Sequence, residues 1–67
     1  MVRFGDRLRE LRIEKGLLQR QVAKPLSVSI MTVSGWERGT REPSIEMIKK
    51  LAKLLECDAN YLIGFGE

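Results

Sequence analysis

The sequence contains no histidine and only one cysteine, Cys57. A single thiol cannot form a disulfide within the chain, and the set of side chains that holds structural zinc is absent. Catalytic histidine is absent too, and no pair of carboxylates marks a cleft for acid–base chemistry. We therefore expect a chain that is not an enzyme, with no catalytic residues, no metal, no cofactor and no small-molecule ligand. Its fold must depend on its hydrophobic core alone.

Long apolar runs are missing as well. No stretch approaches the ~20 residues that a membrane-spanning helix needs, and no signal peptide opens the chain. Together with the free thiol, this predicts a reducing, cytoplasmic setting and no membrane partner. A chain of 67 residues makes one domain, residues 1–67. A domain of this size buries only roughly 60% of the surface that its unfolded form exposes.

Acidic residues are in the minority, with 9 Asp and Glu against 12 Lys and Arg, and the formal net charge is +3. Such an excess is a weak indication of an anionic partner, because many basic domains bind nothing charged. Cations crowd the first segment, where Glu10 and Glu14 can pair with their neighbours along a helix. Charge alone therefore leaves the partner open.

The first helix is expected over residues 5–15. Its apolar residues recur at intervals of four and three, the spacing of an amphipathic helix; they are Phe4, Leu8 and Leu11. Gly16 suits the left-handed conformation that often ends a helix. Arg12 lies four residues after Leu8, near the apolar stripe, where a charge requires a partner.

The stretch over residues 19–38 predicts two short helices joined by a tight turn. The first begins at Gln19 and is weak, because Leu18 offers no side-chain cap and Pro25 lacks a backbone donor. We expect it to stop early, and Ser27 ends it without a glycine.

The second helix of this stretch is expected over residues 30–37, with Ser29 as its N-cap. Val33 and Trp36 lie three residues apart and mark its buried side. The residues that face the other way are small or hydroxylic: Thr32, Ser34 and Gly35. A helix with such an outer face, in a basic chain, suits insertion into the major groove of DNA.

Two further helices are expected after residue 43. Ser44 caps the first, whose buried face carries Ile45, Ile48, Leu51, Ala52 and Leu55 and whose solvated face carries Lys49, Lys50 and Lys53. Asp58 caps the last, residues 59–63, and Gly64 ends it. Five helices joined by short loops leave no room for a sheet, which predicts an all-α fold.

Several short pieces of the sequence carry a family resemblance. They are Gln19, Ala23, Val28, the run Val33–Gly39, the run Glu42–Ser44 and the run Asn60–Gly64. Together and in register, they resemble the helix-turn-helix DNA-binding domain of the Cro/C1 phage-repressor type, also called the XRE family. The resemblance extends from Phe4 to Gly64. It implies a compact five-helix, lambda-repressor-like fold with the helix-turn-helix at about residues 19–38.

The resemblance also implies residue roles. Gln19 would bond a phosphate or an adenine edge, and Arg38 and Arg41 would face phosphates. Arg12 and Glu37 match a buried ion pair that joins the first helix to the end of the third. The full set of DNA-binding residues predicted in this way is Gln19, Ser29, Ile30, Met31, Thr32, Ser34, Gly35, Arg38 and Arg41.

The chain departs from the family pattern at a few positions. Members usually carry Ser or Thr at position 18 and Gly at position 27, where this chain has Leu18 and Ser27. Ile30 and Met31 are apolar at positions where polar base-readers are common. An apolar side chain in the major groove can recognise the C5-methyl group of thymine, and Met31 is the better placed of the two to do so.

Each of these residues also has an ordinary structural interpretation. Gln19 could be an exposed glutamine without a role, and Arg12 and Glu37 could each pair locally. Trp36 is expected in the core, and Cys57 as a small buried hydrophobe. Of the two hydroxylic residues, Thr32 is nearer the helix N-terminus and is the better candidate for base contact than Ser34.

The sequence thus predicts sequence-specific binding of double-stranded DNA by a transcriptional regulator, with repression as the expected outcome. The site would be operator-like and palindromic and bound by a homodimer, with the pairing surface around Asn60 to Phe65. The alternative is a protein-interaction module or an antitoxin-type regulator that uses Ile30 and Met31 as an exposed apolar patch.

Overall fold

The computed structural model describes residues 3–64, and this part of the chain is all-helical, with no strand. The helices are α1 (Phe4–Glu14), α2 (Gln19–Ala23), α3 (Ile30–Arg38), α4 (Ile45–Leu54) and α5 (Ala59–Ile63). The predicted all-α, five-helix fold is confirmed, and each helix begins within a residue of its expected start. None of these helices is long and apolar enough to cross a membrane.

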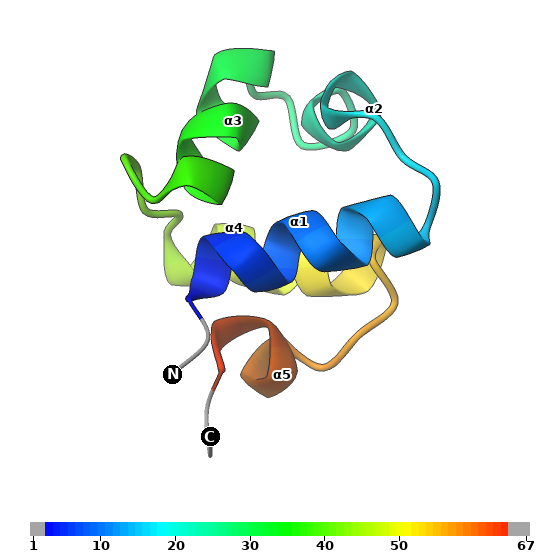
Figure 1. Ribbon diagram of the computed structural model, residues 1–67, viewed down its shortest axis with the longest axis vertical. Coiled ribbons are helices and arrows are strands. Elements are labelled where there is room, and N and C mark those ends of the chain that lie inside the picture. Colours follow the sequence, from blue (N-terminus) through cyan, green and yellow to red (C-terminus); the bar gives the residue numbers. More distant parts are fainter. Residues whose placement is uncertain (1–2, 65–67) are drawn as a thin grey trace.

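The helices form two sides around α1 (Figure 1). In this view, α2 and α3 lie together on one side of α1 and α5 lies on the opposite side. α4 lies behind α1. α1 contacts both α3 and α5, while α2 contacts α3 and α4 contacts α5. The described chain begins and ends near α5. The outer surface of α2 and α3 therefore faces away from α5, after which the described chain ends.

Every helix contributes to one hydrophobic core. The fully buried side chains are Leu8, Val22, Val33, Leu51, Leu55 and Leu62, and Trp36 and Ala23 are buried beside them. Burial of one such aliphatic side chain is worth about 1.5–3 kcal/mol. The predicted inward positions of Val33 and Trp36 are confirmed, and Cys57 is half-buried at the edge of the core. Burial raises the pKa of its thiol, so the thiol is the dominant form at neutral pH.

Ile45 is a correction to the predicted buried face of α4. Its side chain is 74% exposed, whereas Leu51, Ala52 and Leu55 are buried as expected. Ile45 is the first residue of the helix and lies at the margin of its apolar stripe. Its side chain therefore does not reach the core. Met47 and Leu54 fill the other margin of the stripe and pack partly against the core.

Gly5 lies where α1 approaches α3 most closely. A Cβ atom on Gly5 would come within 2.5 Å of the backbone oxygens of Trp36 and Glu37. Backbone atoms of a packed helix cannot move aside without shifting the helix, so a larger residue would force the two helices apart. The absence of a side chain at Gly5 thus sets how α3 rests on α1.

The turn after α2 follows from Pro25 and Ser27. The helix ends at Ala23, early as predicted, and the chain continues through a tight turn to Ser27, which has φ 57°. The Ser27 N–H donates to Lys24 O (3.1 Å) and the Val28 N–H donates to Ala23 O (3.1 Å). This pair of bonds is the Schellman motif, which requires a left-handed residue at the position of Ser27.

Glu56, just after α4, is a second residue other than glycine in the left-handed conformation, with φ 55°. Its carboxylate accepts a hydrogen bond from the Lys15 ammonium (2.6 Å), which ties the end of α4 to the end of α1. This bond and the charge of Lys15 lower the pKa of the Glu56 carboxyl.

Replacing Ser27 by glycine should stabilise the fold. Glycine adopts positive φ without steric cost, whereas an L-residue loses about 1–2 kcal/mol there, part of which is offset by the larger chain entropy of unfolded glycine. We expect Ser27→Gly to raise the free energy of unfolding by about 0.5–1 kcal/mol and the Tm by several degrees. The matched control is Ser34→Gly inside α3, where glycine should lower the Tm. Thermal melts in which both changes act in the same direction would contradict the left-handed turn.

Candidate nucleic-acid interface

The start of α3 is fixed by Ser29. Its Oγ accepts a hydrogen bond from the Thr32 backbone N–H (3.1 Å), which caps the helix as expected. The two side-chain hydroxyls of Ser29 and Thr32 are also within hydrogen-bond distance, 2.9 Å apart. Thr32 was predicted as the better base contact of the two hydroxylic residues, and its hydroxyl is partly engaged in this cap. The cap holds the first turn of α3 in one conformation at the molecular surface.

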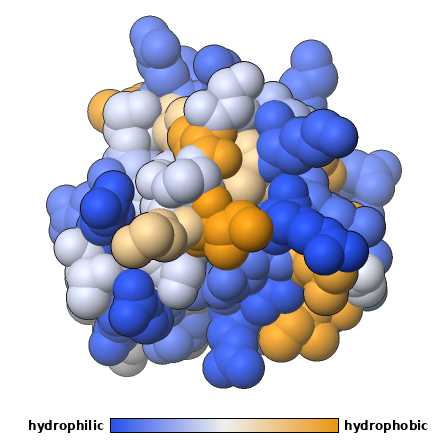
Figure 2. Space-filling view, turned by 90° about the horizontal axis from the view of Figure 1, so that it is seen from above, coloured by the Kyte–Doolittle hydropathy of each residue, from blue (hydrophilic) through white to orange (hydrophobic). Residues whose placement is uncertain are grey.

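α3 separates its residues sharply between inside and outside. Val33, Trp36 and Glu37 are buried, whereas Ile30 is 49% exposed and Met31 is 71% exposed. Figure 2 views the α2 and α3 side of the molecule and shows apolar side chains in the middle of this face with hydrophilic ones around them. Other large apolar residues of the described chain, such as Ile13 and Ile45, are exposed to a similar degree, so the exposure of Ile30 and Met31 gains meaning only from their shared place at the start of α3.

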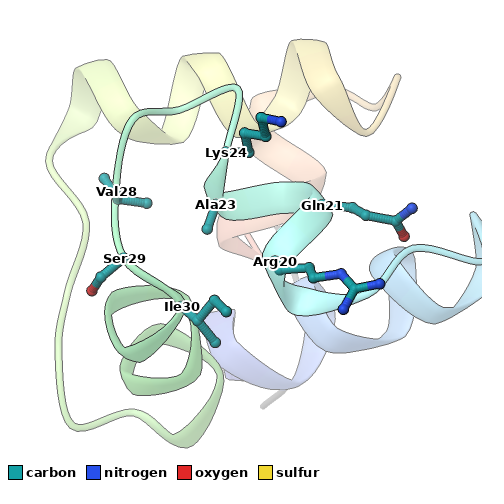
Figure 3. A pocket seen from close by; sticks show the side chains of 7 residues that line it. All are labelled: Arg20, Gln21, Ala23, Lys24, Val28, Ser29 and Ile30. Carbon is teal, nitrogen blue, oxygen red and sulfur yellow. The ribbon is translucent and has the colours of Figure 1, made fainter.

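A hollow of about 550 Å³ lies between α2 and the start of α3 (Figure 3). Ala23, Val28 and Ile30 point toward one another across it, while Gln21 and Ser29 point away. Its full lining is Arg20, Gln21, Ala23, Lys24, Val28, Ser29 and Ile30. The hollow therefore has apolar walls, and Arg20 and Lys24 stand at its α2 margin.

The predicted ion pair between Arg12 and Glu37 is present. The Arg12 Nε donates to Glu37 Oε2 at 2.7 Å and a second guanidinium nitrogen donates to Oε1 at 3.2 Å, so the contact is bidentate. Only 12% of the Arg12 side chain and 4% of the Glu37 side chain are exposed. Arg12 also donates to the backbone oxygen of Leu17 (2.8 Å). This one guanidinium therefore joins α1, the loop before α2 and the end of α3.

Gln19 belongs to the same network. Its side-chain nitrogen donates to Glu37 Oε1 at 3.1 Å, a contact that the sequence did not indicate. An amide NH₂ group carries two donor hydrogens. The bond to Glu37 uses one of them and orients the group, which leaves the other for a further acceptor. The contact of Gln19 with DNA stays a prediction, and the bond to Glu37 sets the orientation of its side-chain amide.

Gly35 differs from the expectation that it is an open, groove-facing position. It is buried, because the side chain of Arg41 lies over it. Arg38 and Arg41 are themselves exposed. The Arg38 Nε lies 3.4 Å from the Ser34 backbone oxygen, to which it donates, so the stem of Arg38 folds back along its own helix.

The described surface places cations at both ends of α3. Arg20 and Lys24 lie on the α2 side, at the hollow. Arg3 donates to the backbone oxygen of Arg38 (2.8 Å) and lines a depression with Arg38 and Arg41 at the other end. Of these cations, only Arg38 and Arg41 were predicted from the sequence. The spacing of four between Arg20 and Lys24, on the solvent side of the predicted helix, could have indicated the α2 pair.

Comparison with known proteins agrees with this geometry. Residues 8–62 match a family model described as helix-turn-helix. The chain belongs to the helix-turn-helix family. The Cro/C1-type resemblance is thereby confirmed, and α2 and α3 are its two helices. The transcriptional repressor RstR of the cryptic phage CTXphi, from Vibrio cholerae, is 40% identical over 64 residues, which are 96% of this chain and 58% of RstR.

Two solved structures show the same fold. The c2 repressor of Salmonella phage P22, in complex with a synthetic operator, superposes with a TM-score of 0.90 at 33% identity and covers 100% of both chains. The restriction-modification controller protein C.AhdI from Aeromonas hydrophila superposes with a TM-score of 0.82 at 44% identity, over 88% of this chain and 89% of its own. This helix-turn-helix chain spans about half the length of the curated relatives it matches.

Breaking the Arg12–Glu37 pair from either side should destabilise the domain strongly. Removing one partner of a buried ion pair leaves the other charge uncompensated, at a cost of about 3–5 kcal/mol. We expect Glu37→Gln and Arg12→Met each to cause a loss of this order in the free energy of unfolding measured with denaturant, with less than the sum in the double variant.

The control for this prediction is the exposed pair of Lys15 and Glu56. Glu56→Gln removes the same carboxylate chemistry from a solvent-screened position and should change the Tm little. Equal melting curves for Glu37→Gln and Glu56→Gln would contradict a structural role for the buried pair.

Proposed function

We propose that this chain binds double-stranded DNA in a sequence-specific manner as a transcriptional regulator, most simply a repressor, with α3 in the major groove. The observation that carries the proposal is the charge and hydropathy arrangement around α3. Its first turn presents Ile30 and Met31 to solvent, and cations flank both of its ends. Such a regulator works in the compartment that holds the DNA, which we take to be the cytoplasm.

The arrangement suits the geometry of the duplex. Phosphates line both edges of a major groove that is about 12 Å wide and admits one helix. Arg20 and Lys24 would meet one strand, and Arg38 and its neighbours the other, which positions the protein without reading sequence. Gln19, held by Glu37, would direct its second amide hydrogen to a phosphate at the start of α2. Ser29 and Ser34 lie at the edge of the proposed DNA-facing surface around α3.

Salt dependence tests the proposal against the alternative of an apolar protein-interaction surface. Binding to phosphates releases counterions, so the logarithm of the association constant should fall steeply with the logarithm of salt concentration. Arg20→Gln and Lys24→Gln should each reduce the magnitude of that slope by about 1, while Lys49→Gln on α4 should leave it unchanged. A duplex selected from random DNA supplies the ligand. Absent or salt-independent binding would favour the protein-interaction alternative.

Met31 is proposed to read the methyl group of a thymine. Its thioether cannot form a strong hydrogen bond, and its side chain is flexible and largely exposed. In the major groove, the C5-methyl of thymine is the apolar feature available to it. Ile30 would form the other wall of the contact.

We therefore expect discrimination of roughly 1–3 kcal/mol at the base pair opposite Met31. Replacing its thymine by uracil removes only the methyl group and should weaken binding of the parent protein. Met31→Ala should bind the thymine and uracil duplexes alike. Equal affinity of the parent for the two duplexes would rule out methyl readout.

A symmetric dimer on the DNA is proposed from the size of the reading surface. One recognition helix spans few base pairs, and two copies with their α3 helices about 34 Å apart would read two half-sites one helical turn apart. Tyr61 and Ile63 on α5 are exposed and suit the pairing surface, while Leu62 between them is buried. Phe65, also expected there, lies outside the described residues. One ring face of Tyr61 is covered by the Arg7 guanidinium, 4.2 Å from the ring centroid.

The footprint of the protein tests the dimer. At saturation, protection should cover two half-sites related by a two-fold axis. Ile63→Glu should shift half-saturation to higher protein concentration without changing the protected sequence, because it weakens pairing and leaves α3 intact. Protection of one asymmetric half-site at saturation would count against a dimer.

A further inference from the structure

Gly35 occupies a position on α3 that should be exposed. It lies four residues after Met31 and three before Arg38, so the three share one face of the helix, and Met31 and Arg38 are both exposed. The buried residues Val33, Trp36 and Glu37 lie on the other side. Gly35 is nevertheless buried, so something other than the core covers it.

The side chain of Arg41 covers it. A Cβ atom on Gly35 would lie 2.9 Å from both Cγ and Cδ of Arg41 and 3.3 Å from its Cβ. The stem of Arg41 therefore runs across the outward face of α3, in space that any other residue at position 35 would fill. Gly35 is what allows the stem to lie there.

The backbone holds Arg41 in this place. After α3 the chain turns back on itself, and the Gly35 carbonyl accepts hydrogen bonds from the Thr40 N–H (2.9 Å) and the Arg41 N–H (3.2 Å). The Thr40 hydroxyl lies 3.4 Å from the same oxygen and donates to it. The start of the Arg41 side chain is thus anchored to the residue that its stem crosses.

The guanidinium at the end of this stem is available for a ligand. Among the described residues, no hydrogen bond or ion pair to protein occupies it. Its stem is packed, so fewer rotatable bonds remain to be ordered on binding than for an arginine extended into solvent. The guanidinium carried by this stem can donate two parallel hydrogen bonds to a planar pair of acceptors.

We propose that Arg41 reads a guanine base in the major groove and is not merely a phosphate contact. The inference rests on the proposed function, since it takes the outward face of α3 as the groove-facing one. On that face, the acceptor pair that fits a guanidinium is O6 and N7 of guanine. Residues 31 and 35 are about 6 Å apart along the helix axis. The guanine should therefore lie within about two base pairs of the thymine opposite Met31.

Site selection from random duplex DNA, followed by affinity measurement on single-base variants, tests this role. The parent should prefer guanine at one position by roughly 5- to 150-fold over the other bases. Arg41→Ala should lose this preference and retain the others. The matched control is Arg38→Ala, which should weaken binding to all of these duplexes by a similar factor. Replacing that guanine by 7-deazaguanine removes N7 and should weaken the parent but not Arg41→Ala.

The variant Gly35→Ala tests whether the position of the Arg41 guanidinium matters, because it leaves the charge of Arg41 in the protein. The added methyl group must displace the stem of Arg41, while the guanidinium stays in the protein, so the guanine preference should fall with the slope of the salt dependence preserved. Alanine also favours helix over glycine, and a thermal melt identifies any loss of folded protein. The same preference in Gly35→Ala and the parent would overturn the positioning role of Gly35.

The possible failures are distinct. If the parent shows no salt-dependent, selective binding to any duplex, the proposed function fails and the guanine role with it. If the parent selects a site but Arg41→Ala weakens all duplexes equally, or none, Arg41 is not a base reader and the inference alone is overturned.

Discussion

The Arg12–Glu37 ion pair is the interaction on which the rest of the structure depends. Three elements from separate parts of the chain meet at one carboxylate: α1 through Arg12, the start of α2 through Gln19, and α3 through Glu37 itself. A buried carboxylate with fewer donors would be costly, so the pair constrains both helices of the helix-turn-helix at once. The mutual placement of α2 and α3, on which any contact with a duplex depends, is therefore enforced by polar contacts as well as by apolar packing. Gly5 adds the complementary constraint, because it lets α1 approach the backbone of α3 directly.

Local chemistry made much of this predictable. The helices could be placed from apolar spacing and from capping residues such as Ser29 and Ser44, because both signals act within a few residues. The same holds for the early end of α2, which follows from the missing donor of Pro25. The apolar register of Arg12 in α1 indicated that this charge needs a partner, whereas the choice of Glu37 as that partner came from the family resemblance, because register alone left local pairing open.

The remaining features depend on contacts between distant segments, which spacing does not encode. Nothing within α3 indicates that Arg41 covers Gly35, because the loop that returns Arg41 to α3 is irregular. Ile45 matches the periodicity of a buried residue, yet its place at the first turn of α4 leaves it in solvent. The bond from Gln19 to Glu37 requires that the start of α2 lie beside the end of α3, which is a property of the assembled fold. The same is true of the close approach at Gly5.

The position of the chain ends has a consequence for how such a domain can be controlled. The described chain ends after α5, on the opposite side of α1 from α3, whereas its first residue, Arg3, reaches Arg38 at the end of α3. A segment joined after α5 would therefore meet the proposed pairing surface before it could reach the duplex. Control by an attached domain would then act through subunit association, and the affinity of each α3 for its half-site would stay the same. In such an arrangement the occupancy of an operator responds to the concentration of paired subunits, which makes the response steeper than that of a single subunit binding alone.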